Sequence, residues 1–260
     1  MSGAHVIDLA PYYGFFFVFS RLAGFFAWMP GIGDNRISMK ARLMFALLTS
    51  VLIFLSVQAY LPSTPLDSTA FNMAITAEFI LGVFAAFTVR ILIAALDMAG
   101  TLVGFNMGLA NAFAQSVATA QQSGIIAVFI TFVGLMTMFA LNLDHQLIAL
   151  MLQSFQIFPA GQLFDAGVFN GDFSHMLVNF LQASFLMALQ IAAPVTILGL
   201  LMMVGAGIVN RLMPALQVFF ILQPLQILLG FAIILLSLGV MVNFFIGDMA
   251  EKLKSVWNQV

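Results

Sequence analysis

An adjacent aspartate and histidine, Asp144 and His145, are the side chains of this sequence best suited to chemistry, and they stand between two apolar stretches. A carboxylate beside an imidazole can relay protons or ligate a metal ion. No second metal ligand has a recognisable spacing, because the other histidines, His5 and His175, lie near the ends of apolar segments. We therefore favour a structural polar contact or a helix break at this pair over a catalytic site.

A second candidate is the sequence Gly-Ile-Gly-Asp at 31–34, which matches the GxGD signature of intramembrane aspartyl proteases. That chemistry needs two carboxylates, one of which has a raised pKa and acts as an acid. The preceding apolar segment contains no partner aspartate, and Asp34 lies in a polar loop with three basic residues. The pattern favours a glycine-rich turn.

Composition excludes a soluble globular class and most enzyme chemistry. The 260 residues are 63% hydrophobic and 7% charged, against about 25% charged in a typical soluble domain. The chain has no cysteine and no GxxxxGKS/T phosphate-binding loop, which removes thiolate chemistry and a bound nucleotide of that type. Its net charge of −2 and scattered basic residues argue against nucleic-acid binding. We expect a membrane protein with no cofactor and no enzymatic activity.

Apolar residues fall into six segments separated by short polar stretches, at 12–30, 43–61, 73–96, 125–158, 176–210 and 212–247. About 20 residues suffice for a helix to cross a membrane. Two charge-free tracts, 173–210 and 212–247, are far longer and contain Pro194 and Pro224, which predicts bent or broken membrane helices. The predicted fold class is all-α: one polytopic membrane domain of long, bent helical hairpins with an amphipathic tail at 249–260.

Charged residues inside apolar segments need partners, because a charge at the membrane centre costs roughly 2.5–3.5 kcal/mol on insertion scales. The residues that we expect to be buried and paired are Arg21, Glu78, Arg90, Asp97, Asp144 and His145. Arg90 and Asp97 share a helix face but lie about 10 Å apart along the axis, which is too far for direct contact. Their partners therefore lie on other helices of this chain or on other subunits.

Glycines repeat at a spacing of four at Gly100, Gly104 and Gly108, which favours close helix packing. The stretch that follows, 109–124, is rich in small and polar residues and makes a poor lipid-facing span. It either lines an aqueous or protein-lined cavity, where irregular backbone is tolerated, or forms an ordinary external loop.

The run from Gly207 to Pro214 has the pattern GxxxRxxP, with Arg211 as its arginine. Further motif positions, in chain order, are Arg21, Gly24, Pro30, Arg36, Arg42, Glu78, Gly82, Gly100, Gly108, His145, Ser154, Phe155, Pro159, Gly161, Phe219, Pro224 and Gly230. Together they resemble the FliR family of flagellar export-gate proteins, whose counterparts serve virulence injectisomes. The positions that depart from the family pattern are Asp144, which replaces a glycine, Ala215, which replaces a glutamine, and Gln217, which replaces an asparagine.

This resemblance implies a subunit of the type III export gate, in the flagellar basal body of the bacterial inner membrane. In that family one copy assembles with FliP and FliQ subunits, together with FlhB. The helical ring that results is the conduit through which unfolded flagellar proteins leave the cytoplasm. Membrane lipid and the secreted proteins are the other expected partners.

The resemblance also implies site residues. The family closes its pore with a plug loop, and by position the plug residues are Gly104, Met107, Gly108, Phe113, Gln115 and Gln121. The residues expected to set the geometry of the helical hairpins are Arg211, Pro214, Pro224, Gly230, Pro159 and Gly161.

Three alternatives stay open on the sequence. The first is an injectisome export-gate subunit, with the same fold and a different cargo. The second is a small-molecule carrier that uses the buried charges as its substrate site, although carriers commonly contain paired halves and this sequence has no convincing internal repeat. The third is the GxGD protease.

Overall fold

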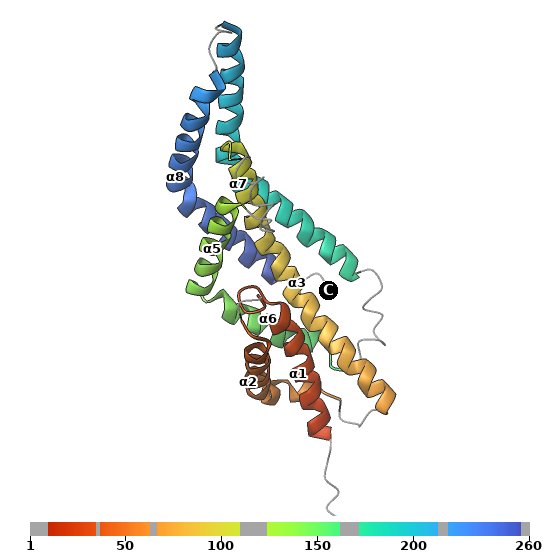
Figure 1. Cartoon of the computed structure of the whole chain (residues 1–260). Coiled ribbons are helices and arrows are strands. Elements are labelled where there is room, and N and C mark those ends of the chain that lie inside the picture. Colours follow the sequence, from red (N-terminus) through yellow and green to blue (C-terminus); the bar gives the residue numbers. More distant parts are fainter. Residues whose placement is uncertain are drawn as a thin grey trace, which may run out of the picture. The chain divides into compact units, whose positions relative to one another are not determined.

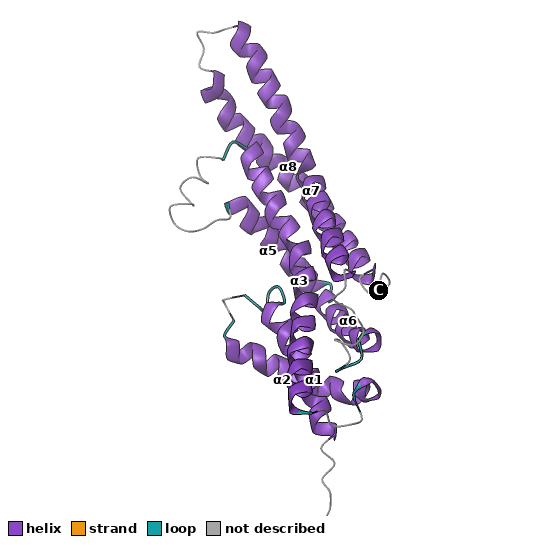
Figure 2. Ribbon diagram, turned by 90° about the vertical axis from the view of Figure 1, so that its right-hand side faces the viewer, coloured by secondary structure: helices purple, strands orange, loops and turns teal. Residues whose placement is uncertain are grey.

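The computed structural model describes residues 10–34, 37–62, 67–109, 124–161, 172–212 and 218–255. Within these ranges all regular secondary structure is helical (Figure 1, Figure 2). The helices are α1 (Ala10–Trp28), α2 (Met39–Val57), the short 3-10 helix η1 (Gln58–Tyr60), α3 (Ser68–Asn106), α5 (Ile125–Ala140), α6 (Leu143–Ile157), α7 (Asp172–Leu212) and α8 (Val218–Ser255). The predicted all-α class is confirmed, and every predicted apolar segment is largely helical.

Local chemistry sets several helix boundaries. Ser38 caps the start of α2, where its hydroxyl accepts a hydrogen bond from the backbone N–H of Ala41. Asn142 has a left-handed backbone, with φ of 55°, and interrupts the apolar segment at 125–158. Because a left-handed residue cannot continue a right-handed helix, that segment forms two helices, α5 and α6.

The two longest charge-free tracts form α7 and α8, which run through Pro194 and Pro224 without interruption. Each helix changes direction along its length (Figure 1). A proline inside a helix removes one backbone hydrogen bond and crowds the preceding turn, which favours a bend. In α8 the change of direction lies well past Pro224, which stands near the start of the helix. The sequence predicted bent or broken helices in these tracts, and both helices are bent but continuous.

Among the residues that the structure describes, four helices qualify as membrane spans by length and composition, at Met39–Tyr60, Ser68–Asn106, Ser174–Leu212 and Leu222–Ser255. The broken pair of α5 and α6, taken as one span, makes five. Helix α1 is apolar but shorter, at Tyr13–Trp28. The chain is a multi-pass membrane protein by these criteria.

Backbone contacts divide the chain into two compact units, which we describe separately. Unit 1 comprises Met1–Arg90, Asn142–Asn179 and Leu253–Val260, and unit 2 comprises Ile91–Leu141 and Phe180–Lys252. Helices α3, α7 and α8 contribute residues to both units. The single helical domain expected from the sequence stays a prediction.

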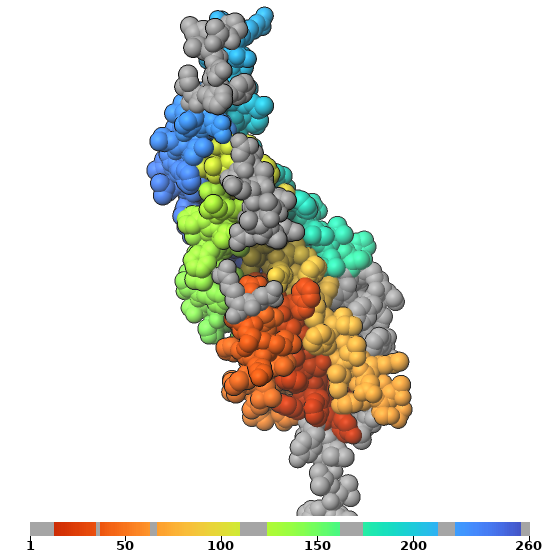
Figure 3. Space-filling model, viewed as in Figure 1, coloured from red at the N-terminus to blue at the C-terminus, as the bar shows by residue number. Residues whose placement is uncertain are grey.

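The core of unit 1 forms where α1 packs against the first half of α3 and the turn after α6. Phe17 of α1 is fully buried with Ala74 of α3 and Ala160. A second buried cluster consists of Ala77, Leu81 and Phe158. Helix α2, by contrast, lies at the surface of this unit (orange in Figure 3) and exposes most of the side chain of Leu52 and Leu55.

Unit 2 is built on close contacts between α3 and α5. Gly100 of α3 lies against the backbone of Ala127 in α5, and Gly134 of α5 lies against the side chain of Leu96 in α3. A methyl group on Gly100 would meet the backbone of Ala127 and force the helices apart, whereas one on Gly134 would displace the end of the flexible Leu96 side chain. Gly100, the first glycine of the predicted repeat, therefore packs two helices together, and the packing role predicted for the repeat as a whole stays a prediction.

Candidate functional site

A buried ion pair lies at the centre of unit 1. The Nε atom of Arg21 in α1 donates a hydrogen bond to Oε2 of Glu78 in α3 over 2.6 Å, and both side chains are 0% exposed. Two charges that the sequence marked as needing partners are thus partners of one another. Burial of two ions is costly, so such a pair is stable only when its remaining donors and acceptors are also satisfied.

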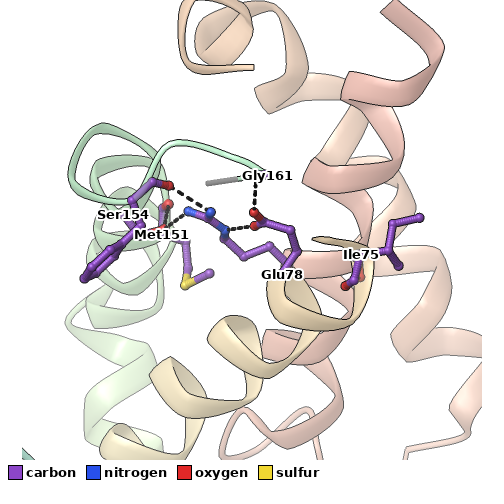
Figure 4. Close-up of polar contacts among 8 residues, drawn as sticks. Ile75, Glu78, Met151, Ser154 and Gly161 are labelled. Carbon is purple, nitrogen blue, oxygen red and sulfur yellow. Dashed lines mark hydrogen bonds and ion pairs between the residues drawn. The ribbon is translucent and has the colours of Figure 1, made fainter. Parts of the chain in front are cut away.

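The remaining hydrogen bonds of the pair come from α6 and the turn after it (Figure 4). Arg21 donates from Nη1 to the hydroxyl of Ser154 at 3.1 Å and from Nη2 to the carbonyl of Phe158 at 2.9 Å. The second oxygen of Glu78 accepts from the backbone N–H of Gly161 at 3.1 Å. These contacts connect α1, α3 and the end of α6, and we call them the Arg21 network.

An aromatic ring and a turn complete the Arg21 network. The guanidinium carbon of Arg21 lies 3.8 Å from the centroid of the Phe155 ring, which is a favourable cation–π distance. Gly161 has φ of 81°, a left-handed conformation that favours glycine, and it directs its N–H at Glu78. Pro159 precedes this glycine in the same turn, and its ring restricts the backbone φ there.

Two glycines allow α1 and α3 to meet closely enough for the ion pair. A methyl group on Gly24 would contact the backbone of Phe79, and one on Gly82 would contact the backbone of Arg21. The side chains of Arg21 and Glu78 are sealed from solvent. The Arg21 network is a buried polar contact that joins α1, α3 and the end of α6.

The GxGD turn pairs its aspartate with an arginine. Asp34 lies 3.5 Å from Nη2 of Arg90, and both side chains are half-exposed. Arg42 donates hydrogen bonds to the backbone carbonyls of Asp34, Ile37 and Ala27 and so fixes the turn between α1 and α2. The turn begins at Gly31, whose φ is 84°. The ion pair and the hydrogen bonds of Arg42 thus hold this turn in place, and we call it the braced GxGD turn.

In the Asp144–His145 pair, the aspartate side chain is largely buried, at 27% exposed, whereas the histidine lies at the surface and not at the buried position expected for it. His145 Nδ1 is 3.3 Å from Asp144 Oδ1, but the histidine side chain is 73% exposed. The pair lies in the first turn of α6, where the positive end of the helix dipole stabilises the negative charge of the aspartate.

Asp97 is half-buried on α3, and within the described ranges no ion pair to its carboxylate is found. Among the described residues no cluster of acidic and histidine side chains is placed to hold a metal ion.

Three of the predicted plug residues form the end of α3, in unit 2. The N–H of Leu109 donates to the carbonyl of Gly104 at 3.1 Å, and the N–H of Gly108 donates to that of Phe105 at 3.0 Å. With Gly108 at φ of 78°, this is a Schellman cap, the common ending of a helix at a left-handed glycine. Met107 is fully buried. Phe113, Gln115 and Gln121 lie outside the described residues.

The predicted hairpin residues do not lie together: Pro159 and Gly161 belong to the turn after α6, and the described remainder lies in α7 and α8. Arg211 is exposed in the last turn of α7, where the negative end of the helix dipole stabilises its positive charge. Pro214 lies outside the described residues, and Pro224 lies within α8. Gly230 of α8 packs on Met107, because a methyl group there would lie 3.1 Å from the methionine sulfur.

Amide side chains around the end of α3 are the functional candidates that sequence reasoning missed. Asn106 donates to the hydroxyl of Thr196 in α7, and Gln223 and Gln226 of α8 donate to backbone carbonyls of α3. The sequence signal that could have found them is the pair Gln223 and Gln226, two polar residues three positions apart in a tract with no charged residue.

The sequence is similar to those of bacterial flagellar export proteins. A family model described as bacterial export proteins, family 1, matches residues 12–251. Flagellar biosynthetic protein FliR of Caulobacter vibrioides is 32% identical over 222 residues, which cover 85% of this chain and 87% of the relative. The protein of the same name from Bacillus subtilis is 30% identical over 235 residues, 90% of this chain and 89% of the relative. That of Escherichia coli is 23% identical over 219 residues, 84% and 82% of the two chains.

Proposed function

The chain belongs to the FliR family of bacterial export proteins, and we propose that it is a structural subunit of the flagellar protein export gate. The observation that carries this proposal is the family match over residues 12–251, nearly the whole chain. The proposed role is not enzymatic. The sealed Arg21 network and the braced GxGD turn support that view, since both use their charges to hold helices in place.

The proposed partners are FliP and FliQ subunits and FlhB, in the basal body at the bacterial inner membrane. Support comes from the apolar side chains that the chain leaves uncovered. In the most apolar windows of α2, α7 and α8, only 22%, 28% and 22% of the residues are buried. Apolar surfaces of this extent need lipid or neighbouring apolar helices.

The proposed mechanism is passive conduction of an unfolded chain. A conduit for polypeptides needs soft side chains that seal against ions and yet part for a chain, and hydrophobic constrictions can gate by dewetting. The 29 phenylalanines and 17 methionines of this sequence suit a deformable seal. The energy for export would come from other subunits.

Residues 104–124 are proposed to help close the pore, through Gly104, Met107 and Gly108 at the end of α3 and through Phe113, Gln115 and Gln121 beyond it. Arg211 and Pro214 are proposed to form the tip of the α7–α8 hairpin. The polarity of 109–124 between apolar flanks motivates the first assignment.

One complementation experiment tests both the export role and the plug. In a host that lacks its own copy, the full-length chain restores secretion of flagellar proteins into the medium. A chain that lacks residues 113–121 assembles but raises ion leakage across the membrane.

Secretion that is unaffected by loss of the chain would refute the export role. Secretion that depends on the chain, with leakage unchanged by the deletion, would refute only the plug assignment. Purification of the shortened chain with its partner subunits is the control for assembly.

A further inference from the structure

The end of α3 leaves backbone carbonyls that its own cap does not satisfy. The last four carbonyls of any α-helix lack partners within the helix. The Schellman cap uses those of Gly104 and Phe105. Of these four, the carbonyl of Asn106 is not used by the cap, and the carbonyl of Gly108 follows just beyond the helix, in a region that the helix dipole makes electronegative.

Two glutamines of α8 satisfy these carbonyls. Nε2 of Gln226 donates to the carbonyl of Asn106, and Nε2 of Gln223 donates to that of Gly108 over 3.4 Å. The spacing of three residues places both side chains on one face of α8. We call these two side chains and their acceptors the glutamine cap.

The glutamine cap lies beside a junction of three helices, all within unit 2. Asn106 donates from its side chain to the carbonyl of Leu102 at 2.8 Å and to the hydroxyl of Thr196 in α7 at 3.2 Å. Gly199 of α7 leaves room for Asn106. The end of α3 is thus held by α7 on one side and by α8 on the other, largely through neutral amide groups.

Packing alone does not fix this helix end. A cavity of about 290 Å³ lies between the end of α3, α7 and α8, and its lining includes Phe105, Met203, Gln223 and Gln226. This cavity is an open pocket with exposed lining residues such as Phe105 and Gln223, so its lining atoms lack protein contacts on one side. Hydrogen bonds from the glutamines therefore carry a larger share of the restraint here than in a close-packed junction.

We propose that Gln223 and Gln226 are positioning residues that hold the end of α3, and with it Gly104, Met107 and Gly108, in the closed conduit. This inference rests on the proposed function. An ordinary neutral hydrogen bond has a net strength that thermal or mechanical load can overcome, so the cap holds the closed state without locking it. Pro224, between the two glutamines, removes a backbone hydrogen bond of α8 and eases the bending that releases them.

The test is a substitution series at Gln226, measured as ion leakage in cells that carry the assembled gate. Gln226→Leu removes the donor, and Gln226→Glu also places a negative charge at the negative end of α3. Gln226→Lys keeps a donor and adds a charge that suits the helix end. We expect leakage to rise about two- to tenfold for Leu, to rise further for Glu, and to stay near the wild-type level for Lys.

The matched control is Gln190→Leu, at an exposed glutamine of α7 that lies outside the cap, which should leave leakage unchanged. Equal leakage for the Leu, Glu and Lys variants would overturn the proposal, because a helix cap requires a donor. If substitutions at Gln226 reduce assembly, exposed Gln223 decides the question, since Gln223→Leu removes a bond at the surface. An assembled Gln223→Leu gate without added leakage overturns the proposal.

The shortened chain without residues 113–121 separates this inference from the proposed function. Leakage from that deletion without leakage from the glutamine variants refutes the positioning role alone. Leakage from neither, with secretion still dependent on the chain, refutes the plug assignment and the positioning role together, and leaves the export role standing.

Discussion

At the scale of single residues, burial decides which charges matter most. Arg21 and Glu78 are sealed from solvent, and each has further hydrogen bonds or ring contacts that satisfy it. Arg90 and Asp34 form a longer contact between half-exposed side chains. Removal of one member of a buried pair leaves an uncompensated charge, whereas an exposed pair exchanges its partner for water.

We therefore predict that Glu78→Gln destabilises the chain by about 3–5 kcal/mol, since it keeps the shape of the side chain and leaves the Arg21 charge unpaired. The matched control, Asp34→Asn, should cost no more than about 1 kcal/mol. Denaturation of the purified proteins in detergent measures both. Equal losses of stability from the two substitutions would contradict a structural role for the Arg21 network.

The sequence predicted that these charges need partners but not which partners they find. The cost of a charge in an apolar segment is a property of the residue and its neighbours, so Arg21 and Glu78 were visible in the sequence. The acceptors on Phe158 and Ser154 depend on how α6 ends, which no local pattern encodes. The exposed position of His145 was missed because Asn142 opens a new helix two residues before Asp144.

At the scale of helices, glycines set how closely axes approach. A methyl group on Gly82 would lie 2.9 Å from the backbone nitrogen of Phe25 and closer still to the carbonyl oxygen of Arg21. The opposing atoms are backbone and cannot rotate away. Gly239 of α8 has no atom within 4 Å of the same position.

Gly82→Ala should therefore destabilise unit 1 by about 1–3 kcal/mol or more, as overpacking does in a rigid core. Gly239→Ala should be neutral or stabilising by up to about 1 kcal/mol, because alanine is the better helix former. Thermal unfolding of both variants in the same detergent compares them directly. If the two midpoints shift alike, α1 and α3 do not meet at Gly82.

Helix positions were better predicted than helix contacts. Long apolar segments fix the existence of a helix, and the predicted segment at 73–96 lies within α3, which extends it at both ends. The glycine at 108 is a local signal for a helix end and stops α3 where it stands. The glutamine cap joins α8 to α3 across more than one hundred residues of sequence, and a polar residue in an apolar tract only hints that some such contact exists.

At the scale of the whole molecule, this chain leaves large apolar surfaces uncovered. Leu235 and Leu236 of α8 are 78% and 85% exposed, although they occupy a helix without charged residues in that part of the chain. Composition predicts this requirement for lipid or partner helices, because the chain has few polar residues with which to cover its faces. It cannot predict how many partners there are, since that number depends on surfaces of other chains.

The central claim is that this chain is one structural part of a larger export conduit. Native mass spectrometry of the affinity-tagged chain, purified from host membranes in mild detergent, tests it most directly. We expect one complex that contains this chain together with several copies of FliP and FliQ. A stable monomer that carries neither subunit would contradict it.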